Sequence, residues 1–139
     1  FQPDLDNRET LHQQALPEVQ HSLEKVADPK ARCLLEKFLT LLLATVRTNC
    51  YQETHPSSSK ECLSFKFDCQ KIDFLPLPVP YYEIFVYSPK LEACHLRSSR
   101  VSRGGIRWCE QLQDFRYEIL SLMKTQTMKN SIVIPTGAK

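Results

Sequence analysis

The spacing of apolar residues changes on either side of a polar segment, residues 52–60, and this change strongly constrains the fold. Before the segment, residues 29–51 have the spacing of a helix, and the run 38–46 contains no charged residue. After it, Leu63, Phe65 and Phe67 alternate with polar residues, which predicts a strand with one buried face. Helix and strand patterns that occur in separate blocks predict an α+β fold.

The helical spacing predicts three helices. A helical pattern of apolar residues appears from Leu11 and continues to Val26, and Pro17 marks the expected start of the first helix, since proline is tolerated in a first turn. Asp28 is a predicted N-cap for a second helix, which we expect to continue without a break over residues 29–51. A third helix is expected over residues 108–124, where apolar residues recur at spacings of four and three.

Three strands are expected after the polar segment, over residues 63–69, 81–87 and 92–97. The intervening run 75–80 reads LPLPVP and cannot form a central strand, because its prolines lack the N–H that a ladder needs. Residues 132–134 could add a short edge strand. The fold class predicted is α+β, with an antiparallel sheet of about three strands packed against two or three helices, in the order α-α-β-β-β-α.

The chain of 139 residues is expected to form a single domain over residues 1–139, because chains of this length usually build one core. Residues 1–10 are predicted to be a loose lead-in, and residues 130–139 a flexible tail. We expect the long helix to pack against the last one. The residues predicted to be buried between them are Phe38, Leu42, Trp108, Phe115 and Ile119.

Six cysteines are many for a chain of this size, and their even number is typical of a disulfide framework. Cys33 and Cys50 lie about 25 Å apart on the expected long helix, which is beyond disulfide reach. Cys62 and Cys69 have opposite parity on one strand, so they point to opposite faces. The pairs that remain favoured are Cys50–Cys62, Cys69–Cys94 and Cys33–Cys109.

Disulfides persist in oxidising compartments, so the cysteine count predicts an extracellular, secreted protein. The alternative is a cytoplasmic protein whose six cysteines are reduced and buried as small apolar side chains. The chain does not begin with Met, so we expect that a leader has been removed or that the chain has been trimmed.

No pattern of residues in the chain indicates catalysis. Cys94 and His95 are adjacent on an expected strand, so they point to opposite faces and cannot form a nucleophile–base pair. The histidines have no spacing typical of a metal site, and the three glycines form no phosphate-binding loop. The sequence therefore predicts no enzyme activity, no metal and no cofactor.

A basic stretch, LRSSRVSRGGIRW, contains four arginines and no acidic residue, and we expect it to form a surface loop before the last helix. Three interpretations remain open: a solvated loop, a site for an acidic partner, or a processing site, because the pattern R-x-x-R occurs twice. A second candidate surface is the strand face that carries aromatic residues. The candidate binding residues are Arg97, Arg100, Arg103, Arg107, Tyr81, Phe85 and Tyr87.

These observations predict a secreted, disulfide-stabilised protein-binding domain of the ligand, receptor-binding or inhibitor type. The alternative is an intracellular scaffold or adaptor module with reduced cysteines. The expected partner is another protein, with an acidic surface or a sulfated polysaccharide as the ligand of the arginines. A membrane span is not expected, because the longest apolar run is too short, and a net charge of +2 makes nucleic acid an improbable partner.

Overall fold

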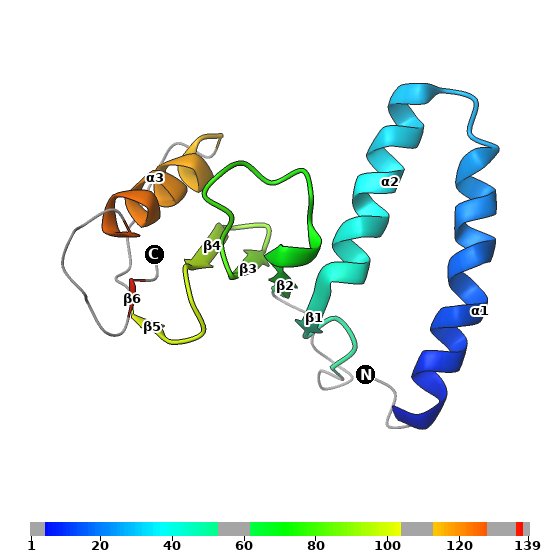
Figure 1. Cartoon of the computed structure of the whole chain (residues 1–139), viewed down its shortest axis with the longest axis horizontal. Helices are drawn as coiled ribbons and strands as arrows, with labels where there is room; N and C mark the ends of the chain where they lie inside the picture. The colour runs from blue at the N-terminus through cyan, green and yellow to red at the C-terminus, as the bar shows by residue number, and fades with distance from the viewer. Residues whose placement is uncertain (1–4, 53–61, 104–112, 128–135, 138–139) are drawn as a thin grey trace. The chain divides into compact units, whose positions relative to one another are not determined.

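The computed structural model of the chain describes residues 5–52, 62–103, 113–127 and 136–137 (Figure 1). It divides into two compact units, residues 1–43 and residues 44–139. The first unit is helical, and the second holds an antiparallel sheet and a helix. The α+β class predicted from the sequence is confirmed.

The first unit is a pair of helices, α1 (Leu5–Glu24) and α2 (Pro29–Ala44). The α2 start lies where the sequence predicts it, because the backbone N–H of Lys30 donates to Asp28 Oδ1 at 3.0 Å. The start of α1 differs from the prediction, because this helix begins before Pro17 and continues through it.

The second helix ends at Ala44, and the prediction that it continues to about Tyr51 is wrong. Residues Thr45–Thr48 form strand β1, which pairs antiparallel with β2 (Leu63–Asp68). Three of its four residues, Thr45, Val46 and Thr48, are β-branched, and such side chains favour a pleated strand. The pairing partner lies beyond the polar segment, so the helix pattern of the local sequence did not reveal it.

The sheet contains four strands in the order β1-β2-β3-β4, and every neighbouring pair is antiparallel. Strands β3 (Tyr82–Tyr87) and β4 (Glu92–Arg97) lie where the sequence predicts them. A short 3₁₀ helix, η1 (Cys69–Lys71), follows β2, and the proline-rich run after it forms no strand. Two further short strands, β5 (Ser102–Arg103) and β6 (Thr136–Gly137), pair in parallel. The edge strand expected at residues 132–134 lies outside the described residues.

Helix α3 (Phe115–Thr127) packs against β4 and completes the core of the second unit. The buried side chains there are Leu96, Leu120 and Met123, with Ile119 packed against them. The predicted core was only partly right. Phe38 and Leu42, which belong to the first unit, are 56% and 66% exposed, and Trp108 lies outside the described residues.

Candidate functional site

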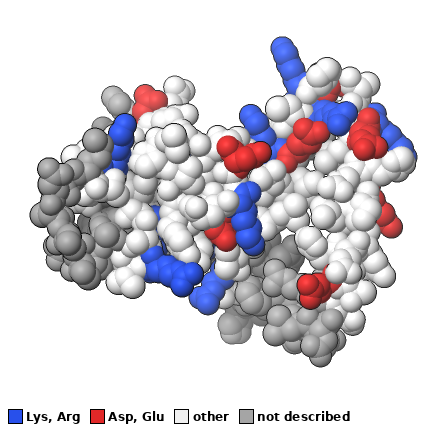
Figure 2. All heavy atoms as spheres, in the orientation of Figure 1, with Lys and Arg blue, Asp and Glu red and all other residues white. Residues whose placement is uncertain are grey.

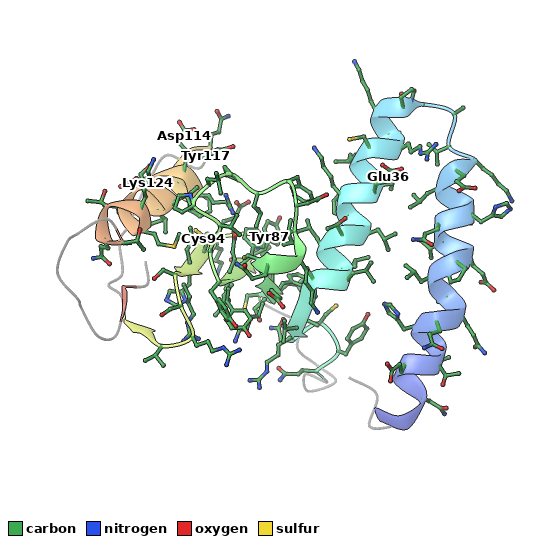
Figure 3. The ribbon with its side chains drawn as sticks, in the orientation of Figure 1. Glu36, Tyr87, Cys94, Asp114, Tyr117 and Lys124 are labelled. Carbon is green, nitrogen blue, oxygen red and sulfur yellow. The ribbon has the colours of Figure 1, made fainter. Side chains whose placement is uncertain are left out.

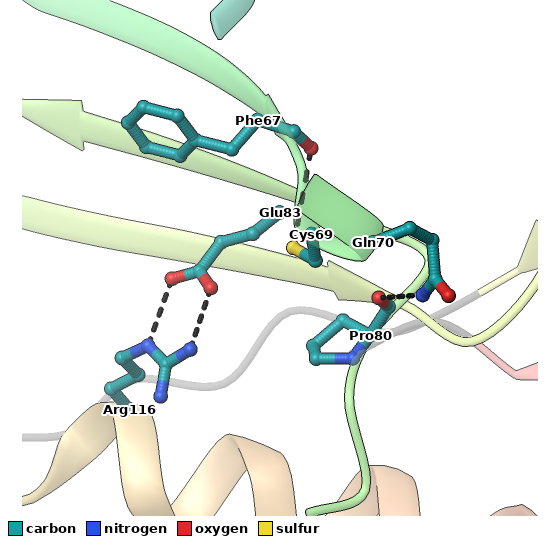
Figure 4. Close-up of polar contacts among 6 residues, drawn as sticks. All are labelled: Phe67, Cys69, Gln70, Pro80, Glu83 and Arg116. Carbon is teal, nitrogen blue, oxygen red and sulfur yellow. Dashed lines mark hydrogen bonds and ion pairs between the residues drawn. The ribbon is translucent and has the colours of Figure 1, made fainter. Parts of the chain in front are cut away.

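The most distinctive polar feature of the second unit is a buried ion pair between Glu83 and Arg116 (Figure 4). Arg116 donates from Nε to Glu83 Oε1 at 2.9 Å and from Nη2 to Oε2 at 2.7 Å. Glu83 is only 7% exposed. In the antiparallel register it lies opposite Phe67 and Leu96, so its side chain projects from the face of the sheet that α3 covers. The two-point contact therefore ties β3 to the first turn of α3.

The hydrogen bonds to Glu83 raise the pKa of Arg116 above its usual value, against the opposing effect of burial. The guanidinium is therefore charged at any physiological pH, and its planar fork matches both carboxylate oxygens. A pair of this kind fixes the orientation of α3 on the sheet, and it is better suited to holding this helix than to transferring a proton.

Two thiols, Cys69 and Cys94, lie in the electrostatic field of this ion pair. Burial, and next the negative charge of Glu83, raise the pKa of Cys69 to about 12 and that of Cys94 to about 11. Because the thiolate is the reactive form, both side chains are poor nucleophiles and poor metal ligands at neutral pH. The geometry thus gives these cysteines a packing role.

The predicted disulfides are wrong for the described cysteines, none of which is disulfide-bonded: Cys33, Cys50, Cys62, Cys69 and Cys94. Cys109 lies outside the described residues. Cys33 and Cys62 are exposed to solvent, whereas Cys69 is completely buried. The sequence argument failed because the number of cysteines does not distinguish disulfide-bonded residues from reduced ones. A reduced cysteine such as Cys69 packs in a core as a small apolar side chain.

Two tyrosines at the start of β3, Tyr81 and Tyr82, lie against cations. Lys66 Nζ lies 4.2 Å from the centre of the Tyr82 ring, and Arg100 Nε donates to Tyr81 Oη at 2.9 Å. The two tyrosine rings contact each other edge to face, with centres 4.8 Å apart. Burial, and next the charge of Arg97, lower the pKa of His95, so this imidazole is neutral at physiological pH.

The predicted binding residues are spread over several elements of the second unit. Arg97 ends β4 and donates to the backbone oxygen of Arg100, which is exposed. Arg103 lies in β5, and Arg107 lies outside the described residues.

The predicted aromatic residues fall in or beside β3. Phe85 and Tyr87 share the face that carries Glu83. Tyr87, which is labelled in Figure 3, is 46% exposed at the end of the strand. Tyr81 precedes the strand, and its backbone N–H donates to the oxygen of Arg97. The structure brings Tyr81 together with Arg97 and Arg100, but not with Tyr87.

Sequence reasoning did not single out Glu83 or Arg116. The signal that could have found the first is its position, since an acidic residue stands inside YYEIFVY, the most apolar strand of the chain. A carboxylate at such a place needs a buried cation. No comparable signal marks Arg116, because its partner is 33 positions away in the sequence.

The described residues show neither a metal-ligand cluster nor a membrane-spanning helix. They contain no group of three or more His, Cys, Asp or Glu side chains placed to hold a metal ion. None of the described helices is both long and apolar enough to cross a bilayer.

Comparison with known proteins gives a consistent result. Residues 18–139 match the family model described as the catalytic domain of bacterial NAD-glutamate dehydrogenase. A Pseudomonas aeruginosa protein named NAD-specific glutamate dehydrogenase is 43% identical over 136 residues, which are 98% of this chain and 8% of that protein. Proteins of the same name from Halomonas elongata and Mycobacterium tuberculosis are 47% and 50% identical, each over 76% of this chain and 7% of their own length. The chain therefore spans less than a tenth of the curated relatives that it matches.

Proposed function

Because the chain belongs to the bacterial NAD-glutamate dehydrogenase family, we propose that it forms part of the catalytic domain of an NAD-dependent enzyme that acts on glutamate. The observation that carries this proposal is the family match over residues 18–139, which include the whole sheet and α3. The similarity of the Pseudomonas aeruginosa relative over nearly the whole chain supports the same conclusion. The activity belongs to a protein much longer than the region compared.

Family membership corrects four predictions made from the sequence. The chain is not a secreted, disulfide-stabilised binding domain, nor an adaptor module, since it matches the catalytic domain of a dehydrogenase. The prediction that it is no enzyme is wrong for the same reason. An extracellular location is wrong as well. The absence of disulfide bonds among the described cysteines supports a reducing compartment inside the cell.

The described residues do not fit a binding site for NAD. A dinucleotide usually binds where a glycine-rich turn joins a strand of a parallel sheet to a helix. The four-stranded sheet here is antiparallel throughout, and the chain contains no G-x-G-x-x-G sequence. We therefore derive no chemical step through NAD from these residues.

The role that the geometry supports is to hold α3 in place within the larger catalytic domain. The Glu83–Arg116 pair fixes the start of the helix, and the packing of Leu120 and Met123 on Leu96 fixes its middle. The other side of α3 is left exposed, including Tyr117 and Lys124 (Figure 3). Glu83 and Arg116 are then positioning residues, because they act through the helix that they orient.

A segment exchange tests the proposal. The aligned segment of the Pseudomonas aeruginosa relative is replaced by this chain, and formation of NADH is followed with glutamate as substrate. We expect the exchanged enzyme to reduce NAD only when glutamate is present. As a control, the same enzyme with the segment deleted should be inactive. A soluble exchanged enzyme with the parent's oligomeric state but no glutamate-dependent NADH formation would contradict the proposal.

A further inference from the structure

The two faces of the four-stranded sheet differ in what covers them. On one face, Glu83 and Leu96 are buried beneath α3. The register places a different set of side chains on the opposite face, and none of them is buried. We call this opposite surface the basic face. Its defining residues are Arg47, Lys66, Tyr82, His95 and Arg97.

Positive charge predominates on the basic face. Arg47 lies directly opposite Lys66 in the register, and Arg97 lies opposite Tyr82 on the next pair of strands. Among the strand residues of this sheet, Asp68 is the one carboxylate that alternation places on the same face. Its Oδ1 accepts the backbone N–H of Gln70. Figure 2 shows several Lys and Arg side chains gathered along the lower side of the region that holds the sheet.

The cations are spread over the whole width of the sheet. Strands lie about 4.8 Å apart, so β1 and β4 are separated by about 14 Å. Arg47 and Arg97 belong to these two outer strands. A single carboxylate or phosphate could contact only part of such an array. The spacing suits an extended ligand with several negative charges.

The tyrosines indicate which kind of polyanion fits. Proteins that hold single-stranded nucleic acid stack bases on aromatic rings that present a free face. Here Lys66 lies over the ring of Tyr82, Arg100 lies 5.8 Å from the centre of the Tyr81 ring, and the two rings contact each other. Each ring therefore positions a cation, and these cations are the groups that a partner can bind.

We propose that the basic face docks an acidic segment of a partner protein, whose carboxylates pair with Arg47, Lys66 and Arg97. Guanidinium groups hold carboxylates through two parallel hydrogen bonds, and the contact of Lys66 with the Tyr82 ring limits the freedom that the lysine side chain loses on binding. This surface is separate from the Glu83–Arg116 pair, which lies on the other face of the sheet. The proposal does not depend on the dehydrogenase activity.

The test measures binding of a fluorescent oligoglutamate peptide by anisotropy. The charge-neutralising variant Arg47→Gln/Lys66→Gln removes two cations of the basic face. We expect it to weaken binding about fivefold or more, because each exposed pair contributes a modest electrostatic free energy. Raising the ionic strength from about 0.05 M to about 0.5 M should also weaken binding by the unaltered protein, since it shortens the Debye length.

The matched control is Lys71→Gln/Lys90→Gln, which removes the same charge from exposed positions outside the basic face. We expect this control to retain the affinity of the unaltered protein. Equal weakening by both double variants would overturn the proposal, since binding would then follow net charge alone. A charge-matched single-stranded oligonucleotide that binds more tightly than the peptide would overturn it too. Thermal unfolding of each variant establishes that the loss does not come from misfolding.

Discussion

At the scale of single residues, two arginine ion pairs among the described residues show how burial changes the energetic contribution of a charge. Arg32 and Glu36 form an i, i+4 pair on α2, and both side chains are about half exposed. Glu83 and Arg116 form a pair whose side chains are 9% and 27% exposed. Solvent screens the attraction between Arg32 and Glu36. Loss of either Glu83 or Arg116, in contrast, leaves the other side chain as an unpaired charge that is largely shielded from water.

The first prediction compares these pairs by mutation. Glu83→Ala should lower the free energy of unfolding by about 2–3 kcal/mol, somewhat below the cost for a fully buried pair because Arg116 keeps some solvent contact. The matched change Glu36→Ala should cost about 0.5 kcal/mol or less. Urea unfolding measures both values. Equal costs for the two variants would mean that the Glu83–Arg116 pair is screened like a surface pair.

The second prediction concerns pH and Cys69. Its pKa rises from the usual 9.0 to about 12 in the folded protein, so the folded state holds the thiol proton more tightly than the unfolded state. The stabilisation that results from this raised pKa is fully present below pH 9. It is lost as the pH rises towards 12, at up to about 1.4 kcal/mol of unfolding free energy per pH unit. The stability of Cys69→Ala should therefore fall less between pH 8 and pH 10 than that of the unaltered protein.

If the unfolding free energy of Cys69→Ala fell as much between pH 8 and pH 10 as that of the unaltered protein, Cys69 would not be buried as described.

At the scale of secondary-structure elements, the sequence predicted those whose pattern is local. Strands β2, β3 and β4 were found from alternation and from flanking turn residues, and the start of α2 from its N-cap. Strand β1 was missed because a contact with β2, far along the chain, decides its conformation. The site was missed for the same reason, since Glu83 meets its partner only when α3 has packed on the sheet.

The third prediction tests the packing of α3. Met123 is 1% exposed and contacts the buried side chain of Leu96, so Met123→Ala should lower the free energy of unfolding by about 2–4 kcal/mol through lost contacts and a cavity. Leu77 is 83% exposed and provides a control, because Leu77→Ala should change stability by less than about 0.5 kcal/mol. A comparable loss for both substitutions in urea unfolding would contradict the placement of α3 on β4.

At the scale of the whole molecule, α2 carries a stripe of exposed apolar side chains. Leu34, Phe38 and Leu42 follow one another at spacings of four along α2, and they are 57%, 56% and 66% exposed. Such a stripe normally lies against another element. Its exposure agrees with the match to a small part of much longer relatives.

The fourth prediction follows from this stripe. The chain expressed alone should bind the apolar dye ANS, because the dye reports exposed hydrophobic surface. Replacing Leu34, Phe38 and Leu42 by Gln should reduce the dye fluorescence, while urea unfolding of the sheet unit stays unchanged because the stripe lies outside that unit. Unchanged fluorescence in the triple variant would show that α2 is covered in solution.

The order of the four strands has a consequence for how the chain folds. Strands β2, β3 and β4 are neighbours both in the sheet and along the chain, so their pairing closes only short loops. Contacts between residues close in sequence form quickly, because little chain entropy is lost in making them. During synthesis the three strands leave the ribosome before α3, so the meander can form first, with Glu83 still exposed to water. When α3 packs on the sheet, Arg116 pairs with Glu83 and the carboxylate becomes buried. Docking of α3 is therefore the step that completes the core.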